Sequence, residues 1–272
     1  MTPIALTIAG SDSSGGAGIQ ADLKTFGALG VYGASVITAL TAQNTRGVTA
    51  IHDVPAEFIA AQIDAVFTDL DIGAVKIGML SQVPAIEAVA AGLKRHDAQN
   101  IVLDPVMVAT SGDRLLAVEA IAALQRDLIP RALVVTPNLH EAAALTDASL
   151  ARNEPEMEAQ ARRILALGPR YVLIKGGHKT EFGDSAESVD LLVSGDGVVR
   201  LAAKRINTRN THGTGCTLSS AIAAGLAKGL DLVAAARAAK TYVTEAIAAA
   251  DKLTVGHGHG PLNHFHEYWR SQ

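Results

Sequence analysis

Short apolar runs alternate with longer alanine-rich stretches along the chain, and this alternation restricts the possible folds more than any other feature. The apolar runs have the length of buried strands, and the stretches between them have helical periodicity. Strands separated by helix-length segments need right-handed crossovers, which give a mainly parallel sheet with helices on both faces, an α/β fold. Strands are expected at Ile4–Ala9, Ser35–Leu40, Ala74–Met79, Ile101–Val106, Leu133–Thr136 and Tyr171–Lys175, and helices at residues 17–29, 56–69, 83–95, 117–127, 156–167, 216–228, 232–250 and 263–270.

One segment departs from this pattern. Two apolar stretches, 190–193 and 198–201, flank Ser194-Gly195-Asp196-Gly197, whose glycines favour a tight turn. We expect a β-hairpin there, as an antiparallel edge or a small flap. No low-complexity linker, repeat or break in composition divides the chain, so residues 1–272 are predicted to form a single domain.

Composition excludes several classes of protein. Hydrophobic residues make up 49% of the chain and charged residues 18%, which is incompatible with intrinsic disorder. The net charge of −4 provides no basic surface, so no nucleic-acid partner is expected. The sequence shows neither a basic leader nor an apolar run of the ~18 residues that a membrane span needs, which predicts a cytoplasmic protein. The one cysteine, Cys216, cannot form an internal disulfide, as is typical of a reducing compartment.

Small, polar and charged residues follow the predicted strands. Parallel strands place their carboxyl ends at the same edge of a sheet, where open α/β sheets bind their ligands. The sequence therefore predicts a binding site at that edge. In strand order, the residues concerned are Gly10–Gly18, Gln43-Asn44, Gly78-Met79, Asp104-Pro105, Thr136-Pro137-Asn138 with Glu141, and Lys175-Gly176-Gly177.

The segment Gly16–Ala21 fits the G-x-G-x-x-A fingerprint of nicotinamide dinucleotide sites and lies between a predicted strand and a helix. A nicotinamide-dependent oxidoreductase is therefore an alternative interpretation. Two features weaken it, because a six-residue polar insert precedes the glycines and the second strand ends in Gln43-Asn44 rather than in a ribose-binding acid. The chain has no G-x-x-x-x-G-K-[ST] motif, which excludes a P-loop enzyme.

The segment Asn210–Ser220 gives the strongest local signal. Gly213 and Gly215 precede a predicted helix, where backbone N–H groups and the helix dipole favour an anion such as a phosphate. Cys216 lies at the start of that helix, where the dipole is expected to lower the pKa of the thiol. The alternative is a helix-entry turn with a buried structural cysteine.

Seven motifs occur in order along nearly the whole chain: Ala9–Asp22, Thr41–Gly47, Lys76–Leu80, Asp104–Met107, Thr136–Glu141, Asn210–Ser220 and Gly258–Pro261. Through these motifs the chain resembles the hydroxymethylpyrimidine/phosphomethylpyrimidine kinases of thiamin biosynthesis, in the ribokinase-like superfamily. The resemblance implies a three-layer α/β/α fold with a small β flap. It also implies phosphorylation of 4-amino-5-hydroxymethyl-2-methylpyrimidine, and then of its monophosphate, with ATP and Mg²⁺.

The resemblance further implies a role for individual residues. Phosphoryl transfer has a loose transition state, so catalysis consists mostly of positioning and charge neutralisation. Cys216 stands where sugar kinases of the superfamily have Asp, and would take the proton of the substrate hydroxyl. The other implied positions are Gly213, Thr214 and Gly215 for the anion hole, Lys175, Asn138 and Thr211 for the nucleotide, and Asp104 and Glu141 for Mg²⁺ or its waters.

The acceptor of this reaction is a flat aminopyrimidine, which presents an amine donor beside a ring-nitrogen acceptor. A carboxamide matches both groups with its own C=O and NH₂, and the resemblance places Gln43 in this role. The resemblance also implies an apolar slot around the ring. Its residues would be Gly10, Ala17, Asp22, Met79 and Val106.

Other interpretations of these residues stay open. A pyridoxal kinase of the same fold would take a flat hydroxymethyl heteroaromatic of similar size, and a non-catalytic sensor would bind a pyrimidine phosphate without transfer. Glu141 could serve only as a first-turn acid of a helix, and Asp104-Pro105 only as a turn that ends a strand.

Four histidines near the end of the chain, His257, His259, His264 and His266, invite a zinc interpretation. Their spacing is not that of a standard metal site, and we expect neither a cysteine nor a nearby pair of acids to complete one. A turn leading into a short terminal helix is the preferred interpretation. A homodimer is the expected assembly, because two-fold dimers are the commonest oligomers.

Overall fold

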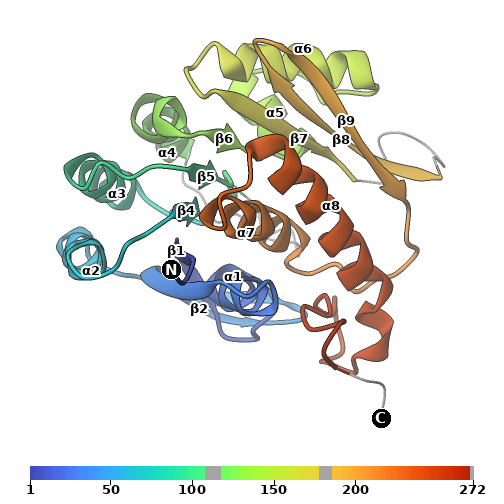
Figure 1. Ribbon diagram of the computed structural model, residues 1–272, viewed down its shortest axis with the longest axis horizontal. Helices are drawn as coiled ribbons and strands as arrows, with labels where there is room; N and C mark the ends of the chain where they lie inside the picture. Colours follow the sequence, from blue (N-terminus) through green and yellow to red (C-terminus); the bar gives the residue numbers. More distant parts are fainter. Residues whose placement is uncertain (108–117, 178–185, 270–272) are drawn as a thin grey trace.

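The computed structural model describes residues 1–107, 118–177 and 186–269. Its strands are β1 (Ile4–Asp12), β2 (Tyr32–Asn44), β3 (Gly47–Asp53), β4 (Ala74–Ile77), β5 (Ile101–Leu103), β6 (Val134–Val135), β7 (Tyr171–Gly176), β8 (Glu187–Ser194) and β9 (Gly197–Lys204). They form one sheet in the order β3-β2-β1-β4-β5-β6-β7-β8-β9 (Figure 1). The strands from β2 to β7 pair in parallel, whereas β3 at one edge and the β8–β9 hairpin at the other are antiparallel.

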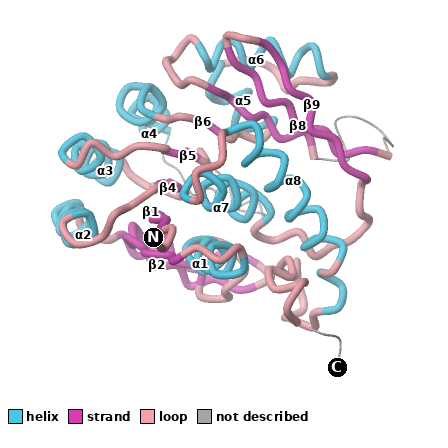
Figure 2. The backbone as a smooth tube through the Cα atoms, in the orientation of Figure 1, coloured by secondary structure: helices cyan, strands magenta, loops and turns pink. Residues whose placement is uncertain are grey.

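Helices cover both faces of this sheet (Figures 1 and 2). One face carries α1 (Gly18–Ala28), α7 (Thr214–Ala227) and α8 (Leu232–Ala248), and the other carries α2 (Ala56–Phe67), α3 (Val83–Arg95), α4 (Val118–Ala123), α5 (Leu139–Thr146) and α6 (Glu154–Leu165). A separate apolar cluster fills the space between the sheet and each helix layer. In the part of the chain that is described, no helix is long and apolar enough to span a membrane. The predicted α/β fold, with a mainly parallel sheet between two helix layers and a β-hairpin, is confirmed.

The helix α7 is buried on nearly all sides because its side chains are small. Ala221, Ala223 and Ala224 are at most 3% exposed. A methyl group at Gly225 would lie 2.8 Å from the Cβ atom of Ala235 on α8. Small residues allow α7 to approach both the sheet and α8 closely, and a densely packed helix has little freedom to move. The N-terminus of α7 is therefore held firmly behind the carboxyl ends of the central strands.

Two elements lie outside the predicted set. The edge strand β3 has mostly exposed side chains, so it lacks the apolar pattern by which the other strands were predicted. The helix α5 has only eight residues, too few for a clear period. It begins with a capping box, in which the side chains of Asn138 and Glu141 each accept a hydrogen bond from the other residue's backbone N–H. Local capping chemistry, rather than periodicity, marks this helix in the sequence.

The predicted terminal helix over residues 263–270 is wrong, because turns occupy residues 264–268. The carbonyl oxygen of His264 accepts a hydrogen bond from the Tyr242 hydroxyl, 2.7 Å away on α8. That oxygen is thus satisfied by tertiary structure and not by a helical N–H group. Positions 117 and 270, at the ends of two predicted helices, fall outside the described residues.

Candidate active site

A cavity of about 580 Å³ lies at the carboxyl ends of the parallel strands. Its size is that of a small-molecule site. Loops that follow several strands line one side of it, and the first turn of α7 lines the other. The cavity brings together all but one of the residues expected to form the site: Gly10, Ala17, Gln43, Met79, Asp104, Val106, Asn138, Glu141, Lys175, Thr211, Gly213, Thr214, Gly215 and Cys216.

The loop before α7 has a conformation that favours glycine. Gly213 is the N-cap of α7 with a φ of +83°, and a methyl group there would overlap the carbonyl oxygen of Gly16. The Thr214 hydroxyl donates a hydrogen bond to the carbonyl oxygen of Thr211 over 2.7 Å, which tightens the turn. Backbone N–H groups without helical partners and the positive end of the helix dipole make this turn suited to bind a phosphate.

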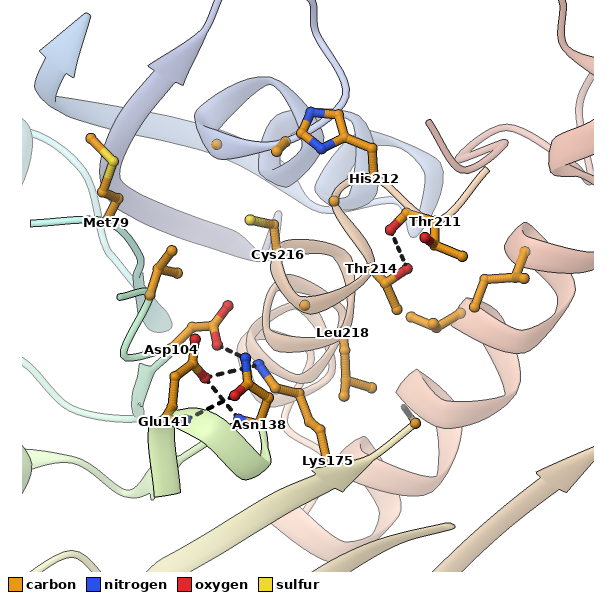
Figure 3. Close-up of a pocket in the computed structure, with 18 of the residues that line it drawn as sticks. Met79, Asp104, Asn138, Glu141, Lys175, Thr211, His212, Thr214, Cys216 and Leu218 are labelled. Atoms are coloured by element: carbon orange, nitrogen blue, oxygen red, sulfur yellow. Dashed lines mark hydrogen bonds and ion pairs between the residues drawn. The ribbon is translucent and has the colours of Figure 1, made fainter. Parts of the chain in front are cut away.

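The ammonium group of Lys175 lies close to two buried carboxylates. Its Nζ atom lies 2.8 Å from Oδ1 of Asp104 and 3.8 Å from Oε2 of Glu141 (Figure 3). Burial acts to raise the pKa of Asp104, but Lys175 and then Lys76 outweigh it and hold that pKa below its usual value. For Glu141, burial dominates over Lys175 and, together with the negative charge of Asp104, raises the pKa to about 7.

Asp104 and Glu141 fit a magnesium site. Mg²⁺ is usually held by one or two carboxylates together with waters and substrate phosphates. The capping box fixes the Glu141 carboxylate, because its Oε2 accepts a hydrogen bond from the Asn138 N–H over 2.7 Å. The two interpretations of Glu141, as a first-turn acid and as a metal ligand, are therefore compatible. Burial and then the charge of Asp104 raise the pKa of Glu141, and a divalent cation between the two carboxylates would favour its charged form.

Cys216 is the third residue of α7, and its partly exposed side chain lines the cavity. The expectation that the helix N-terminus lowers its pKa is wrong. Burial raises the pKa of the thiol to about 11, although Lys76 and the backbone N–H of Gly18 act in the opposite direction. Loss of water around a thiolate thus outweighs the partial charge of a helix end.

Gln43 lies at an irregularity near the end of β2. The pairing of β2 with β3 shifts register between Ala42 and Gln43, and such bulges change the direction of a side chain. The Thr41 hydroxyl donates a hydrogen bond to Oε1 of Gln43 over 3.0 Å. Ser13 holds the backbone of Gln43, because its hydroxyl oxygen accepts from the N–H over 2.9 Å and donates to the C=O over 2.8 Å. A carboxamide that is oriented before binding loses less entropy on binding.

Small residues leave room for a flat ring beside Met79. A methyl group at Gly10 would lie 2.7 Å from Cε of Met79, so glycine permits this close contact. The backbone of Met79 is anchored by the Thr38 hydroxyl, which donates to its carbonyl oxygen over 2.8 Å. Ala17 and Val106 also line the cavity. Gly10, Ala17, Met79 and Val106 thus give this part of the cavity an apolar surface, which suits a flat ring.

Asp12 joins the loop after β1 to the loop before α7. Its Oδ2 accepts hydrogen bonds from the N–H groups of Gly16 and Ala17 and lies 2.8 Å from Nε2 of His212. Its Oδ1 accepts from the N–H and the hydroxyl of Ser14. Burial acts to raise the pKa of Asp12, but the hydrogen bonds from His212 and Ser14 outweigh it and lower the pKa to about 2.

The prediction that Asp22 shapes the ring slot is wrong. Asp22 does not line the cavity, is 0% exposed and forms an ion pair with Lys76. Lys76 is also 0% exposed but lies at the cavity wall, and it was not among the predicted site residues. The sequence carries a signal for it, because a lysine inside the apolar run Ala74-Val75-Lys76-Ile77 needs a buried partner.

The far end of the cavity, towards the β8–β9 hairpin and α8, was also not predicted. Val243, Thr244 and Ile247 are neighbours on one face of α8, a spacing that by itself indicates only core packing. Basic residues from the end of β9 and from α8 stand beside them: Lys204, Arg205 and Lys240. Lys240 is paired with Asp190 of β8 over 2.7 Å. This end has the apolar surface and positive charge that suit a nucleoside phosphate.

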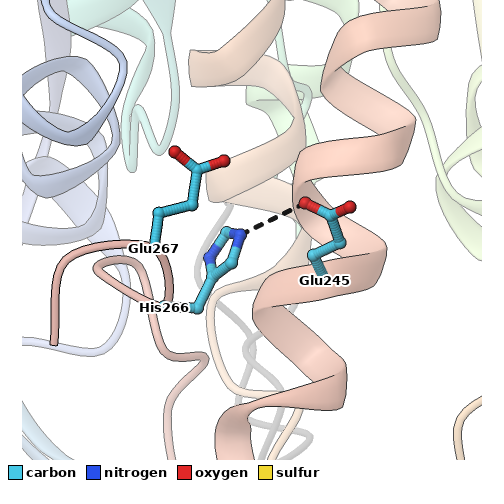
Figure 4. Close-up of side chains that lie close together, drawn as sticks. All are labelled: Glu245, His266 and Glu267. Carbon is cyan, nitrogen blue, oxygen red and sulfur yellow. Dashed lines mark hydrogen bonds and ion pairs between the residues drawn. The ribbon is translucent and has the colours of Figure 1, made fainter. Parts of the chain in front are cut away.

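The C-terminal histidines do not gather in one place. His264 is buried with its Nε2 3.0 Å from the Thr217 hydroxyl, and burial lowers its pKa to about 4. His266 lies beside Glu245 of α8 and next to Glu267, with ligand atoms of the three residues within 4.8 Å of one another (Figure 4). The expectation that no acids stand near these histidines is therefore wrong. This cluster does not line the cavity, and Nε2 of His266 lies 3.3 Å from Oε2 of Glu245.

Comparisons with known proteins agree with this geometry. The family model described as phosphomethylpyrimidine kinase matches residues 12–263. A hydroxymethylpyrimidine/phosphomethylpyrimidine kinase of Rhizobium meliloti (strain 1021) is 62% identical, over 99% of this chain and 100% of its own. Among solved structures, a Bacillus subtilis pyridoxal kinase in complex with ADP has a TM-score of 0.89 at 39% identity, covering 97% of this chain and 98% of its own. A phosphomethylpyrimidine kinase from Clostridium difficile 630 has a TM-score of 0.78 at 47% identity, covering 90% and 99%. These neighbours confirm the expected ribokinase-like fold, and the length and strength of the sequence matches show that the chain belongs to the phosphomethylpyrimidine kinase family.

Proposed function

We propose that this chain transfers the γ-phosphoryl group of ATP to 4-amino-5-hydroxymethyl-2-methylpyrimidine, and then phosphorylates the resulting monophosphate. The position of Cys216 carries the proposal. The one thiol of the chain lies in the first turn of α7, beside the glycine loop, and lines the same cavity as Lys175 and Gln43. A proton acceptor, an anion hole and an amide that can hydrogen-bond the pyrimidine ring would thus face the same cavity. The relative from Rhizobium meliloti, named for both phosphorylations, supports this proposal.

In the first transfer, Cys216 receives the proton of the hydroxymethyl group on its thiolate sulfur. The acceptor oxygen forms a bond to the γ-phosphorus while the bond from that phosphorus to the β–γ bridging oxygen breaks, and ADP leaves. Gly213 and Gly215 offer backbone N–H groups to the charge on the transferring group, and Lys175 adds a positive charge beside it. The backbone N–H of Thr214, the third predicted member of the anion hole, donates to the carbonyl oxygen of Thr211 over 3.2 Å. Because the thiol has a pKa of about 11, the thiolate fraction and the rate of this step rise with pH above neutrality.

The second transfer makes different demands on the same site. Its acceptor is the phosphate of the monophosphate, which is already an anion and needs no base. Lys175 and the glycine loop would serve both steps, whereas Cys216 would matter mainly to the first. Asp104 and Glu141 would hold Mg²⁺ or its waters, and the ion would neutralise phosphate charge. One cavity can therefore carry out two successive phosphorylations.

Pyridoxal phosphorylation is the second candidate activity. The Bacillus subtilis pyridoxal kinase, a structure solved with ADP, has a higher TM-score than the solved phosphomethylpyrimidine kinase. Both acceptors are flat rings with a hydroxymethyl group, and only the pyrimidine offers an exocyclic amine to Gln43. An ATP-consumption assay with the aminopyrimidine alcohol, its monophosphate and pyridoxal tests the proposal. Turnover of both pyrimidines above pyridoxal supports it, and turnover of pyridoxal alone contradicts it.

The remaining interpretations are weaker. Membership of a kinase family excludes the nicotinamide-dependent oxidoreductase. A non-catalytic sensor predicts that phosphate-handling groups are missing, whereas Lys175, Glu141 and Cys216 all line the cavity. A cytoplasmic homodimer is also proposed, on the basis of the single cysteine and of the frequency of two-fold dimers. Size-exclusion chromatography with light scattering tests the dimer.

A further inference from the structure

Residues 256–261, which we call the strap, follow α8 and do not line the cavity. Three consecutive backbone N–H groups of the strap donate to a single residue, Thr45. Those of His257 and Gly258 donate to Oγ1 of Thr45 over 3.2 and 3.0 Å, and that of His259 donates to its carbonyl oxygen over 2.8 Å. Thr45 lies in the turn between β2 and β3, so the strap holds this turn by its backbone and by its side chain.

Two glycines of the strap serve this contact. Gly256 has a φ of +69°, a conformation that glycine adopts without strain. A methyl group at Gly258 would overlap the carbonyl oxygen of Thr45. The first glycine therefore permits the path of the strap, and the second permits its close approach to the turn.

The other end of the strap contacts the loop before α7. The N–H of Gly260 donates to Oδ1 of Asn210 over 3.1 Å, and its carbonyl oxygen accepts from the N–H of His212 over 3.1 Å. His212 is directly followed by Gly213, the N-cap of α7. The strap thus connects a turn that begins two residues after Gln43 to the residue in front of the anion hole.

The β2–β3 turn has little apolar packing of its own. The side chains of β3 are mostly exposed, and Asn44 and Arg46 are exposed on either side of Thr45. A segment with few buried apolar contacts moves easily unless hydrogen bonds restrain it. Ser13 restrains the backbone of Gln43 itself, and the strap restrains the turn that follows. The place of Gln43 therefore depends on hydrogen bonds from other parts of the chain.

We infer that the strap is a positioning element for the acceptor: by joining Thr45 to Asn210 and His212, it sets the distance between Gln43 and the anion hole. The inference deepens the proposed function, because it rests on Gln43 as the residue that binds the pyrimidine ring. Phosphoryl transfer needs the acceptor oxygen close to the γ-phosphorus and in line with the leaving oxygen. A misplacement of about 1 Å can slow a reaction about 10²-fold. A link between the ring site and the phosphate site therefore acts on the rate of transfer.

Thr45→Val tests the strap, because it keeps the shape of the side chain and removes the oxygen that accepts two N–H groups. We expect kcat/KM for the aminopyrimidine alcohol to fall about tenfold. The Kd for ADP, measured by calorimetry, should stay at the wild-type value, because the contacts of the strap with Asn210 and His212 remain. Thr45→Ser keeps the oxygen and should keep the wild-type rate. Gly258→Ala disturbs the same contact from the side of the strap and should also lower kcat/KM.

The matched control is Thr49→Val in β3. The Thr49 hydroxyl donates to the carbonyl oxygen of Ala42 over 2.9 Å, so this variant removes a hydroxyl from the same hairpin and leaves the strap intact. We expect wild-type kinetics from it. Circular dichroism and the melting temperature establish that each variant is folded. The inference would be overturned by an equal fall in kcat/KM for Thr45→Val and Thr49→Val, by a matching loss of ADP affinity, or by a lower melting temperature of Thr45→Val and Gly258→Ala with unchanged kinetics.

A double-mutant cycle shows whether the strap acts through Gln43. If it does, Thr45→Val should change kcat/KM little in a protein that already carries Gln43→Leu, because the ring then lacks the contact whose position the strap sets. Losses that multiply in the double variant would show that Thr45 acts on another part of the site, and they would overturn the inference.

The wild-type assay separates this inference from the proposed function. If the wild type phosphorylates the aminopyrimidine and every variant matches it, the inference fails and the proposed function stands. If the wild type phosphorylates pyridoxal alone, the proposed function fails, and the same variants are compared with pyridoxal, whose ring would bind in the same slot. Slower transfer in Thr45→Val and Gly258→Ala than in Thr49→Val then supports the strap as a positioning element, and equal rates overturn it.

Discussion

Replacing Asp12 by Asn tests the link between the two loops that enclose the acceptor end of the cavity. Asp12 is 2% exposed, and its carboxylate accepts hydrogen bonds from the loop after β1 and contacts His212 in front of the glycine loop. Asparagine keeps the size of the side chain but removes the charge and one acceptor oxygen. The variant should therefore loosen both loops without creating a cavity.

The size of the effect follows from the pKa of Asp12. Burial alone would raise it, but the hydrogen bonds lower it from 3.8 to about 2. A drop of nearly two pKa units, at about 1.4 kcal/mol per unit, corresponds to about 2.5 kcal/mol of folding stability. A lowered pKa means that this contribution is complete above the unfolded-state value of 3.8 and is lost as the pH falls through about 2. By pH 3, about 1 kcal/mol of it should be gone.

Urea unfolding of the wild type and of Asp12→Asn, at several pH values between 7 and 2.5, measures this contribution. We expect the free energies of unfolding to differ by about 2 kcal/mol at pH 7 and to converge as the pH falls below 4. The matched control replaces an exposed aspartate, in Asp71→Asn. The free energies of unfolding of this variant and of the wild type should coincide at every pH.

Parallel curves for the wild type and Asp12→Asn would refute this reasoning. The carboxylate would then have the same proton affinity in the folded and unfolded states, and the hydrogen bonds to Asp12 would contribute nothing that depends on its charge. A difference in the free energy of unfolding between the wild type and Asp12→Asn that grows towards low pH would also refute it, because the expected difference shrinks as the pH falls.

Four further substitutions test the site. Cys216→Ala should slow the first phosphorylation by about 10²–10⁴ and the second much less, in parallel assays with the alcohol and the monophosphate; equal losses would contradict the role of the thiol. Lys175→Ala should lower kcat for both steps in steady-state kinetics, whereas a rise in KM for ATP alone would show that the lysine only binds the nucleotide. Gln43→Leu should lower kcat/KM for the aminopyrimidine roughly 5–150-fold and for pyridoxal far less, and an unchanged aminopyrimidine value would remove Gln43 from recognition. Gly213→Ala should lower the melting temperature and both rates, because its methyl group overlaps Gly16, while Gly195→Ala, which points into open space, should change neither.

Much of the architecture could be predicted from local pattern. The runs Ala74–Met79 and Ile101–Val106 contain the observed strands β4 and β5, and the predicted helix over 83–95 is the observed α3. Buried strands and amphipathic helices leave their period in the sequence, because each residue's neighbours in the element lie within a few positions. The edge strand β3 left no such trace, because its outer side chains face water and carry no apolar constraint.

The sequence also determined which residues gather at the site. In a parallel sheet the residues after each strand meet at one edge, so Asp104, Lys175 and Gln43 could be placed together from their positions alone. The tertiary structure decided the solvation of each side chain and the charges around it. The pairing of Asp22 with Lys76 joins residues 54 positions apart, and that of Asp12 with His212 joins residues 200 apart. The pKa of Cys216 depends on burial first and on such distant charges next. The burial of a side chain and the effect of distant charges on its pKa depend on the whole fold. A local stretch of sequence therefore cannot predict them.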